Sequence, residues 1–487
     1  MKDALERLFR HSAVFLIGLM FQRAARVLLL PLYWSAFPPA QFGLLDLFEV
    51  FIQVMVLTFS FALPTAYVKF HRIDVAEGVA PDVLRGTTLA LSAIGIVLLA
   101  LAMAVFQTPL SWLFFDRRYP RLYAIASAAI VANIAFLLVQ SALRARGRAG
   151  TFVILSTIQF VLLMALNIYL VKGRGMGLEG VIWSAALACA FPALIYALFR
   201  TRGARWRLDL AIARRLLRFA LPLVPFSLVA FLLMISARLF LQHSHGAEVV
   251  GIFSAANRVA LILLLVCVTP FQTAWGYLGL DYLRRGDAGE LFSRTFTYLL
   301  AWSLWGFLAI SSVGREFILR FGASHYLPSL PYVDPLMAGY AMQLFFYWAN
   351  IALVGREMTV RILLISLLPF AVSIVGGWLA IPRYGLGAAC GVLFTAMAIH
   401  ALLTAIFAGR IIHFSLEKPR VAKALLAFAV AYGFAWGLRS GLPQWRLVIS
   451  LGPVAAFPLL LLALGFLTHG ETVRLQGLRR YVTPWAR

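Results

Sequence analysis

Long apolar runs recur along nearly the whole chain, and they restrict the possible fold more than any other feature. Runs of 18 or more apolar residues are typical of helices that cross a membrane, because a helix satisfies its own backbone polar groups inside lipid. Strands of a membrane barrel would be about ten residues long and alternating. With 62% hydrophobic and 13% charged residues, the composition also excludes an ordinary soluble protein. We therefore predict an all-α polytopic membrane protein.

The apolar runs define about fourteen transmembrane helices. The predicted spans are 11–36, 42–67, 84–106, 121–143, 150–171, 178–199, 216–241, 249–275, 291–313, 332–354, 361–381, 386–408, 421–438 and 447–468. Most connections are short, so we expect spans that follow each other in sequence to be antiparallel neighbours.

The basic residues are distributed unequally between the two sides of these spans. With basic residues in the first four positions of a span counted with the connection before it, 29 of the 43 Lys and Arg residues lie in the termini and the even-numbered connections, and 10 lie in the odd-numbered connections. Cytoplasmic loops carry such an excess, so both termini are predicted to be cytoplasmic. Topology thereby accounts for the net charge of +24, and no nucleic-acid partner is needed. The remaining four arginines lie inside spans: Arg23, Arg26, Arg238 and Arg258.

The connection from Arg200 to Arg218 carries seven arginines. Its section "RWRLDLAIARRLLRF" is typical of an amphipathic helix lying on the inner leaflet. One interpretation is a linker between two lobes that also contacts anionic lipid. The other is charge that only sets the topology.

The chain also contains an internal repeat. Four pairs of motifs match in order at a nearly constant offset of 208 to 210 residues. The matched positions are Gly43 and Gly251, Arg85 and Arg294, Gln140 and Asn350, and Gly177 and Gly387. Spans 1–6 and 7–12 are therefore predicted to be two copies of one six-helix unit, with spans 13 and 14 as an appendage.

The repeat predicts the domain organisation: an N-lobe over 1–199, a cytoplasmic amphipathic linker over 200–215, a C-lobe over 216–410, and two further spans with a cytoplasmic tail over 411–487. An even number of helices per copy gives both copies the same orientation in the membrane. Transporters with such parallel repeats place the substrate path between the lobes and alternate access by rocking them.

The predicted site consists of charged residues inside the membrane. A charge at the bilayer centre costs about 2.5–3.5 kcal/mol on insertion scales, so it usually faces a partner or a cavity. Asp46, Glu49 and Gln53 share one helical face, and Arg23 and Arg26 share another. One interpretation is that these two arginines pair with the two carboxylates and hold spans 1 and 2 together.

The alternative is a cationic cavity with a titratable carboxylate. Four arginines in spans (Arg23, Arg26, Arg238 and Arg258) against two acids leave a positive excess, and the planar guanidinium suits phosphate and pyrophosphate. We predict that these arginines bind an anionic head group, and that Asp46, Glu49 and Gln53 serve ion coupling or charge pairing.

Other site types find little support. No phosphate-binding G-x-x-x-x-G-K-[ST] loop is present, and the connections are too short for an enzyme domain. We predict no enzymatic activity, no cofactor and no metal site. Tyr33 and Trp34 are interpreted as interfacial aromatic residues or as a stacking surface for a sugar.

Several stretches resemble one family. "LYWSAFPPAQFGLLDLFEVF" with "FALPTAYVKFHR" is similar to the opening hairpin of the polysaccharide (Wzx-like) flippases, and "RLFLQHSHGAEVVGIFSAANRVA" is similar to their span 7 to span 8 segment. "GMGLEGVIWSAALA" and "YGLGAACGVLFTA" resemble their paired sixth and twelfth spans. The resemblance covers most of residues 1–410. It extends to the multidrug/oligosaccharidyl-lipid/polysaccharide exporter superfamily, which also holds the lipid II flippases and the multidrug extruders.

The resemblance implies two six-helix lobes in a V around a central cavity. It implies export of a polyprenyl-pyrophosphate-linked oligosaccharide across the bacterial inner membrane for O-antigen, exopolysaccharide or capsule biosynthesis, with a polysaccharide polymerase or glycosyltransferase as a partner. Cavity arginines would hold the pyrophosphate. The alternatives are an ion-coupled multidrug or cation antiporter of the same superfamily, or a lipid II flippase.

Overall fold

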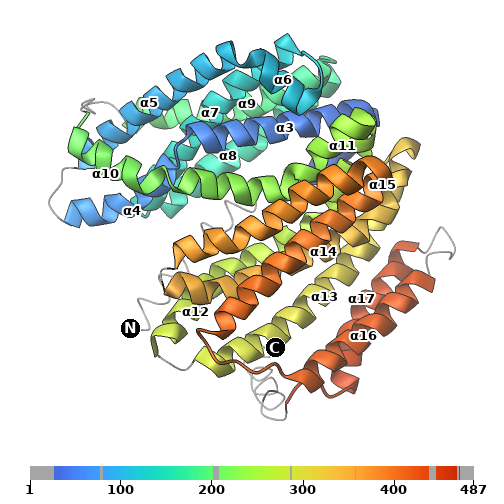
Figure 1. The fold of residues 1–487 in the computed structure, drawn as a ribbon. Coiled ribbons are helices and arrows are strands. Elements are labelled where there is room, and N and C mark those ends of the chain that lie inside the picture. Colours follow the sequence, from blue (N-terminus) through green and yellow to red (C-terminus); the bar gives the residue numbers. More distant parts are fainter. Residues whose placement is uncertain are drawn as a thin grey trace, which may run out of the picture. The chain divides into compact units, whose positions relative to one another are not determined.

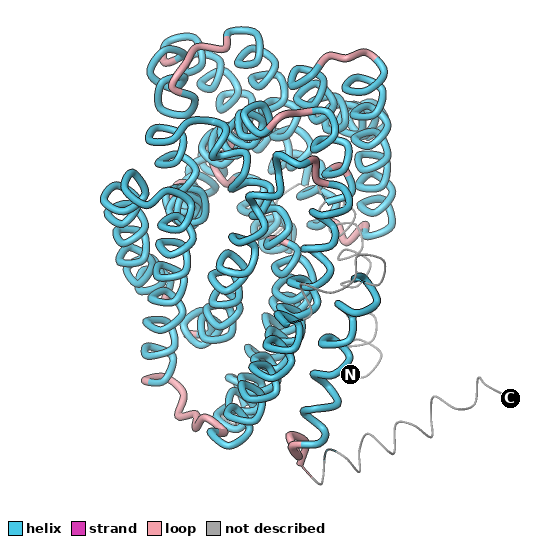
Figure 2. The backbone as a smooth tube through the Cα atoms, turned by 90° about the vertical axis from the view of Figure 1, so that its right-hand side faces the viewer, coloured by secondary structure: helices cyan, strands magenta, loops and turns pink. Residues whose placement is uncertain are grey.

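The computed structural model describes residues 27–76, 81–200, 208–285, 288–356, 358–437, 446–468 and 471. Throughout these residues the chain forms helices joined by loops, and no strand occurs among them (Figure 2). Nine helical runs within this part of the chain are long and apolar enough to cross a membrane. The predicted all-α polytopic class is confirmed.

The chain divides into two compact units. The first comprises residues up to Arg258, together with Phe321–Ser329 and Ser366–Ala396. It contains α2 (Leu30–Ala36), α3 (Pro39–Phe59), α4 (Leu63–Ala76), α5 (Pro81–Val105), α6 (Gln107–Phe115), α7 (Pro120–Ala145), α8 (Ala149–Asn167), the π-helix η1 (Ile168–Gly173), α9 (Gly177–Arg200), α10 (Leu210–Ala220), most of α11 (Leu223–Ala260) and the 3-10 helix η3 (Ser324–Ser329). Within it α7 packs along α9 (Figure 1).

The second unit comprises Val259–Arg320, Leu330–Ile365 and Met397–Arg487. Its described elements are the π-helix η2 (Leu264–Val268), α12 (Thr269–Arg285), most of α13 (Ala288–Phe321), α14 (Leu330–Gly355), the two ends of α15 (Thr359–Gly409), α16 (Lys418–Gly437) and α17 (Arg446–Ala463). Helices α16 and α17 lie side by side (Figure 1). The predicted division into two lobes, a linker and an appendage stays a prediction.

Glycines end two of the predicted spans. Within α11, Gly246 has φ 81°, and within α15, Gly385 has φ 57°. Residues other than glycine rarely adopt such a positive φ. The backbone at each glycine is not helical, so it divides one long helical run into two. The breaks fall in the connections predicted between spans 7 and 8 and between spans 11 and 12.

The predicted span 42–67 is wrong in its course, because the helix ends earlier. Helix α3 ends at Phe59, the next residues turn with φ of 49° at Phe61 and 50° at Ala62, and α4 begins at Leu63. Pro64 gives the physical reason. A proline has no N–H to donate, and its ring clashes with the carbonyl four residues earlier, which favours a break ahead of it and a new helix with the proline in its first turn.

The amphipathic segment forms a helix of its own. Asp209 caps α10 by accepting a hydrogen bond of 3.0 Å from the Ile212 N–H, as expected for an N-cap residue. The apolar face of α10 packs on α4 and α5 through a cluster that includes Ala213, Leu216 and Ala220. Protein therefore covers the face that was expected to lie on lipid.

One arginine holds the C-terminal helix pair to α13. Arg420 donates to the carboxylates of Glu417 and Glu471, to the carbonyl of Phe466 and to the hydroxyl of Tyr298, at 2.9–3.1 Å. Its guanidinium also lies over the Tyr298 and Phe466 rings. This cluster ties the start of α16 to the segment that follows α17.

Candidate functional site

Two glycines bring α3 and the second part of α11 into backbone contact inside the first unit. A Cβ added to Gly43 would overlap the Ala247 carbonyl oxygen and lie 2.7 Å from the Gly251 nitrogen. A Cβ added to Gly251 would overlap the Pro39 carbonyl and lie 2.9 Å from the Pro39 Cα. Because no side chain fits at either position, the two helices cross at the closest distance that backbones allow.

The contact is reciprocal across the internal repeat. Gly43 meets Ala247, and Gly251 meets Pro39, which is the position equivalent to Ala247 at an offset of 208 residues. One turn further along, the Ser254 hydroxyl donates to Asp46 Oδ2 at 2.8 Å, and these residues are also 208 apart. The contacts that α3 makes with α11 are thus repeated with the two copies exchanged, as around a local twofold axis.

The crossing places two arginines against two carboxylates. Arg238 Nε lies 2.6 Å from Asp46 Oδ2, and Arg258 Nη2 lies 3.4 Å from Asp46 Oδ1 and 3.0 Å from Glu49 Oε2. The side chains of Asp46, Arg238 and Arg258 are 7%, 7% and 8% exposed, whereas that of Glu49 is 39% exposed. The cluster is therefore closed around Asp46 and open at Glu49.

Aromatic rings support both guanidiniums. Arg258 lies 4.9 Å from the Phe42 ring centroid, and Arg238 lies 5.8 Å from that of Phe253. The Tyr326 ring packs edge-on against Phe42, and its hydroxyl donates to the Phe37 carbonyl at 2.9 Å. Cation–π contacts attract a guanidinium to the face of a ring, so each arginine has an aromatic contact in addition to its ion pairs.

The structure brings together four of the seven predicted site residues: Asp46, Glu49, Arg238 and Arg258. Gln53 lies one turn beyond Glu49 and is half-buried. Arg23 and Arg26 lie outside the described residues, so their predicted pairing with Asp46 and Glu49 is not decided. For the described part of the site, arginines of α11 are the ion-pair partners of both carboxylates.

The sequence analysis did not predict two kinds of residue in this cluster: the serine that donates to Asp46 and the aromatic residues that contact the arginines. Ser254 had a signal, because it occupies the position equivalent to Asp46 in the repeat. Phe42 and Phe253 had none, since aromatic residues are common throughout this chain. Tyr33 and Trp34 were interpreted as candidates for sugar stacking, but they are only 3% and 1% exposed, and the Tyr33 hydroxyl donates to Asn167 at 2.9 Å. In this conformation neither ring is accessible to a sugar.

Among the described residues, no group of three or more His, Cys, Asp or Glu side chains could hold a metal ion. His243 bonds the Leu239 carbonyl, and His245 bonds the Ser244 hydroxyl. The charged groups that the structure places together are two arginines and two carboxylates, which can hold or release an anionic or cationic group.

The sequence profile of the family described as "Polysaccharide biosynthesis protein" matches residues 8–275, which include the helix crossing and all four charged residues of the cluster. The chain belongs to this family. No curated protein matches the sequence.

Solved structures show the fold of this polysaccharide biosynthesis family protein. The lipid II flippase MurJ in an inward closed conformation is similar with a TM-score of 0.75 at 12% identity, over 92% of this chain and 98% of MurJ. A MOP superfamily transporter from Pyrococcus furiosus is similar with a TM-score of 0.58 at 16% identity, over 86% and 96%. An outward-facing multidrug resistance MATE family transporter of the MOP superfamily gives 0.55 at 17%, over 82% and 94%. The protein is a multi-pass membrane protein with this transporter fold.

Proposed function

We propose that the protein is a flippase that translocates a polyprenyl-pyrophosphate-linked oligosaccharide from the cytoplasmic to the outer leaflet. It would act by alternating access in the biosynthesis of a surface polysaccharide such as O-antigen, exopolysaccharide or capsule. Family membership and the fold support a transporter of this superfamily. The observation that supports a pyrophosphate-linked substrate is the pairing of Arg258. This arginine is buried, and one of its two carboxylate partners, Glu49, is accessible enough for another anion to replace it.

The two partners of Arg258 differ in what they can do. Asp46 is sealed and also accepts from Ser254 and pairs with Arg238, so it holds the guanidinium in place. Glu49 is 39% exposed, so an incoming anion can replace it. A pyrophosphate offers the same bidentate acceptor geometry with more charge. In our proposal the substrate displaces Glu49, and Glu49 returns when the substrate leaves.

The positive excess expected from the sequence is not present in the described cluster by itself. Two arginines and two acids there are in mutual contact, so their formal charges cancel. The excess charge for pyrophosphate therefore depends on Arg23 and Arg26, which are proposed to join Arg258 and Arg238 in binding the head group. Asp46, Glu49 and Gln53 are proposed to act in charge pairing or ion coupling.

The cellular setting is proposed on the same basis. We place the protein in the bacterial inner membrane with both termini in the cytoplasm, as the distribution of Lys and Arg favours. A polysaccharide polymerase or glycosyltransferase is the proposed partner on the same pathway, and the protein itself is proposed to move its substrate without altering a covalent bond.

The test is leaflet translocation in vesicles that contain only this protein. Undecaprenyl-pyrophosphate carrying a short fluorescent oligosaccharide would be placed in both leaflets, and a membrane-impermeant quencher would report its movement. We expect wild type to move the probe and Arg258→Ala to lose most of the rate. Glu49→Gln removes the competing carboxylate and should tighten binding of the probe by up to about tenfold, the scale of one charge-assisted hydrogen bond.

Matched controls separate the site from general loss of charge. Arg294→Ala removes an exposed arginine of the second unit, which pairs with Glu290 and with no residue of the cluster that the structure describes, and it should leave translocation unchanged. Equal rates for wild type and Arg258→Ala would contradict the site assignment. Failure to move several such glycans, combined with proton-driven export of a cationic dye that tolerates Arg258→Glu, would replace the flippase by the antiporter alternative.

A further inference from the structure

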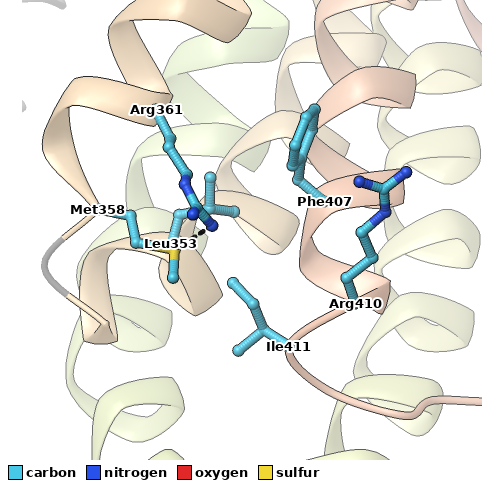
Figure 3. Close-up of a pocket in the computed structure, with 6 residues that line it drawn as sticks. All are labelled: Leu353, Met358, Arg361, Phe407, Arg410 and Ile411. Carbon is cyan, nitrogen blue, oxygen red and sulfur yellow. Dashed lines mark hydrogen bonds between the residues drawn. The ribbon is translucent and has the colours of Figure 1, made fainter.

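A second basic site lies in the second unit, whereas the charged cluster of α3 and α11 belongs to the first. A cavity of about 430 Å³ is lined by two arginines and four side chains that are apolar or carry sulfur. The end of α14, the start of α15 and the end of α15 supply them, as Figure 3 shows. The lining residues are Leu353, Met358, Arg361, Phe407, Arg410 and Ile411.

The two guanidiniums have weak partners. Arg361 donates to the thioether sulfur of Met358 at 3.5 Å, and Arg410 lies 5.3 Å from the ring centroid of Phe407. Both arginines are exposed, and no carboxylate of the described residues forms an ion pair with either. A thioether is a poor acceptor, so most of the donors on both planar groups remain for an anionic ligand that can accept several hydrogen bonds.

The surroundings point to a lipid as the source of the anion. Leu364 follows Arg361 by three residues and is 58% exposed. Ile406 and Leu402 precede Arg410 by four and eight residues and are 46% and 60% exposed. Residues at these spacings share a helix face, so an exposed apolar stripe leads away from each arginine. A free phosphate ion would make no use of such stripes, whereas acyl chains would cover them.

The side of the membrane agrees with this source. Arg361 begins the eleventh predicted span, next to the tenth connection, and Arg410 lies in the twelfth connection. The distribution of Lys and Arg places even-numbered connections in the cytoplasm. Anionic phospholipids concentrate in that leaflet, and basic pockets between helices on the cytoplasmic side bind their head groups. We propose that this pocket binds the phosphate of an anionic phospholipid of the inner leaflet, with its acyl chains along the two stripes.

Native mass spectrometry of the purified full chain tests the proposal. The probe is phosphatidylglycerol at limiting concentration, compared with phosphatidylcholine of the same chain length and with inorganic phosphate. We expect the Arg361→Gln/Arg410→Gln double variant to bind the first phosphatidylglycerol at least tenfold more weakly, the scale for loss of charge-assisted hydrogen bonds. The Arg361→Lys/Arg410→Lys variant should retain part of the affinity, because charge remains without the planar donor set.

The matched control is Arg117→Gln/Arg118→Gln, which removes the same charge from exposed residues in the connection between α6 and α7. Unchanged binding in this control together with weak binding in the pocket variant supports the site. Equal weakening in both would show that affinity follows net charge, and this would overturn the assignment. Phosphatidylcholine binding as tightly as phosphatidylglycerol, or inorganic phosphate displacing the lipid at similar concentration, would also overturn it.

Discussion

The crossing of α3 and α11 predicts that alanine is not tolerated at either of two glycines. A Cβ on Gly43 would stand 2.7 Å from the backbone nitrogen of Gly251, and an ordinary contact begins at 3.4 Å. The helices would have to separate by at least 0.7 Å there, and by more to clear the Ala247 carbonyl. Overpacking typically costs about 1–3 kcal/mol. Because the obstacle is backbone and no side chain can rotate away, we expect a cost at the upper end.

The protein carries its own reporter for this measurement. Cys189, Cys267 and Cys390 are free thiols that are 4%, 1% and 3% exposed, so a thiol-reactive fluorescent dye labels them only as the structure opens. We expect Gly43→Ala and Gly251→Ala each to lower the apparent midpoint of thermal unfolding in detergent.

Two other glycines provide the control for that experiment. Gly391 and Gly433 lie inside helices, and a Cβ there would meet nothing within 4 Å. Alanine at either should be neutral, or should stabilise by about 0.5–1 kcal/mol through helix propensity. The double variant of the crossing should cost less than the sum of its single variants, because the first substitution already separates the helices. Midpoints for Gly43→Ala and Gly251→Ala that match those of the control glycines would refute the close crossing.

Two further predictions concern charged residues. Asp46→Asn should destabilise the protein by about 3–5 kcal/mol, because it leaves the buried Arg238 and Arg258 with one carboxylate partner, Glu49, in place of two. Adding Arg238→Gln should recover part of the loss in the same unfolding assay. An unchanged unfolding midpoint for Asp46→Asn would contradict this role. At Glu471, burial raises the carboxyl pKa, but hydrogen bonds from Tyr298 and Thr468 and the charge of Arg420 outweigh it and lower the pKa to about 2. A folded-state pKa below the ordinary value of 4.5 gives stabilisation that is complete above pH 4.5 and is lost as the pH falls towards 2. The difference in midpoint between wild type and Glu471→Gln, followed by tryptophan fluorescence, should shrink over that range, and a pH-independent difference would contradict the ionised pair.

The helical fold could be predicted because each span depends mainly on its own residues. A run of apolar residues long enough for the bilayer predicts a helix without knowledge of its neighbours. The breaks at Gly246 and Gly385 fall in predicted connections for the same local reason. The predicted span 42–67 failed because hydropathy does not register a proline: "FALP" is apolar throughout, but Pro64 starts a new helix.

The ion pairs could be predicted only in part, because pairing depends on how helices cross. Hydropathy shows that these charges lie inside spans, but no sequence rule gives the rotation that turns Asp46 towards Arg238 and Arg258 of α11. The repeat holds the missing information. At an offset of 208 residues, Asp46 corresponds to Ser254 and Arg258 corresponds to Val50.

Among the described residues, the acid Asp46 therefore belongs to the first copy, and its basic partners Arg238 and Arg258 belong to the second. The twofold-like glycine crossing is what allows this division, since it brings position 46 against position 254 and so within reach of Arg258. A motion that separates α3 from α11 must break the ion pairs of Asp46 with Arg238 and Arg258. Unpaired charges inside the membrane are costly. An anionic substrate that takes over Arg258 lowers that cost for the arginine and leaves Glu49 free. In the proposed mechanism, the charge division between the copies would make the movement of these helices depend on what occupies the site.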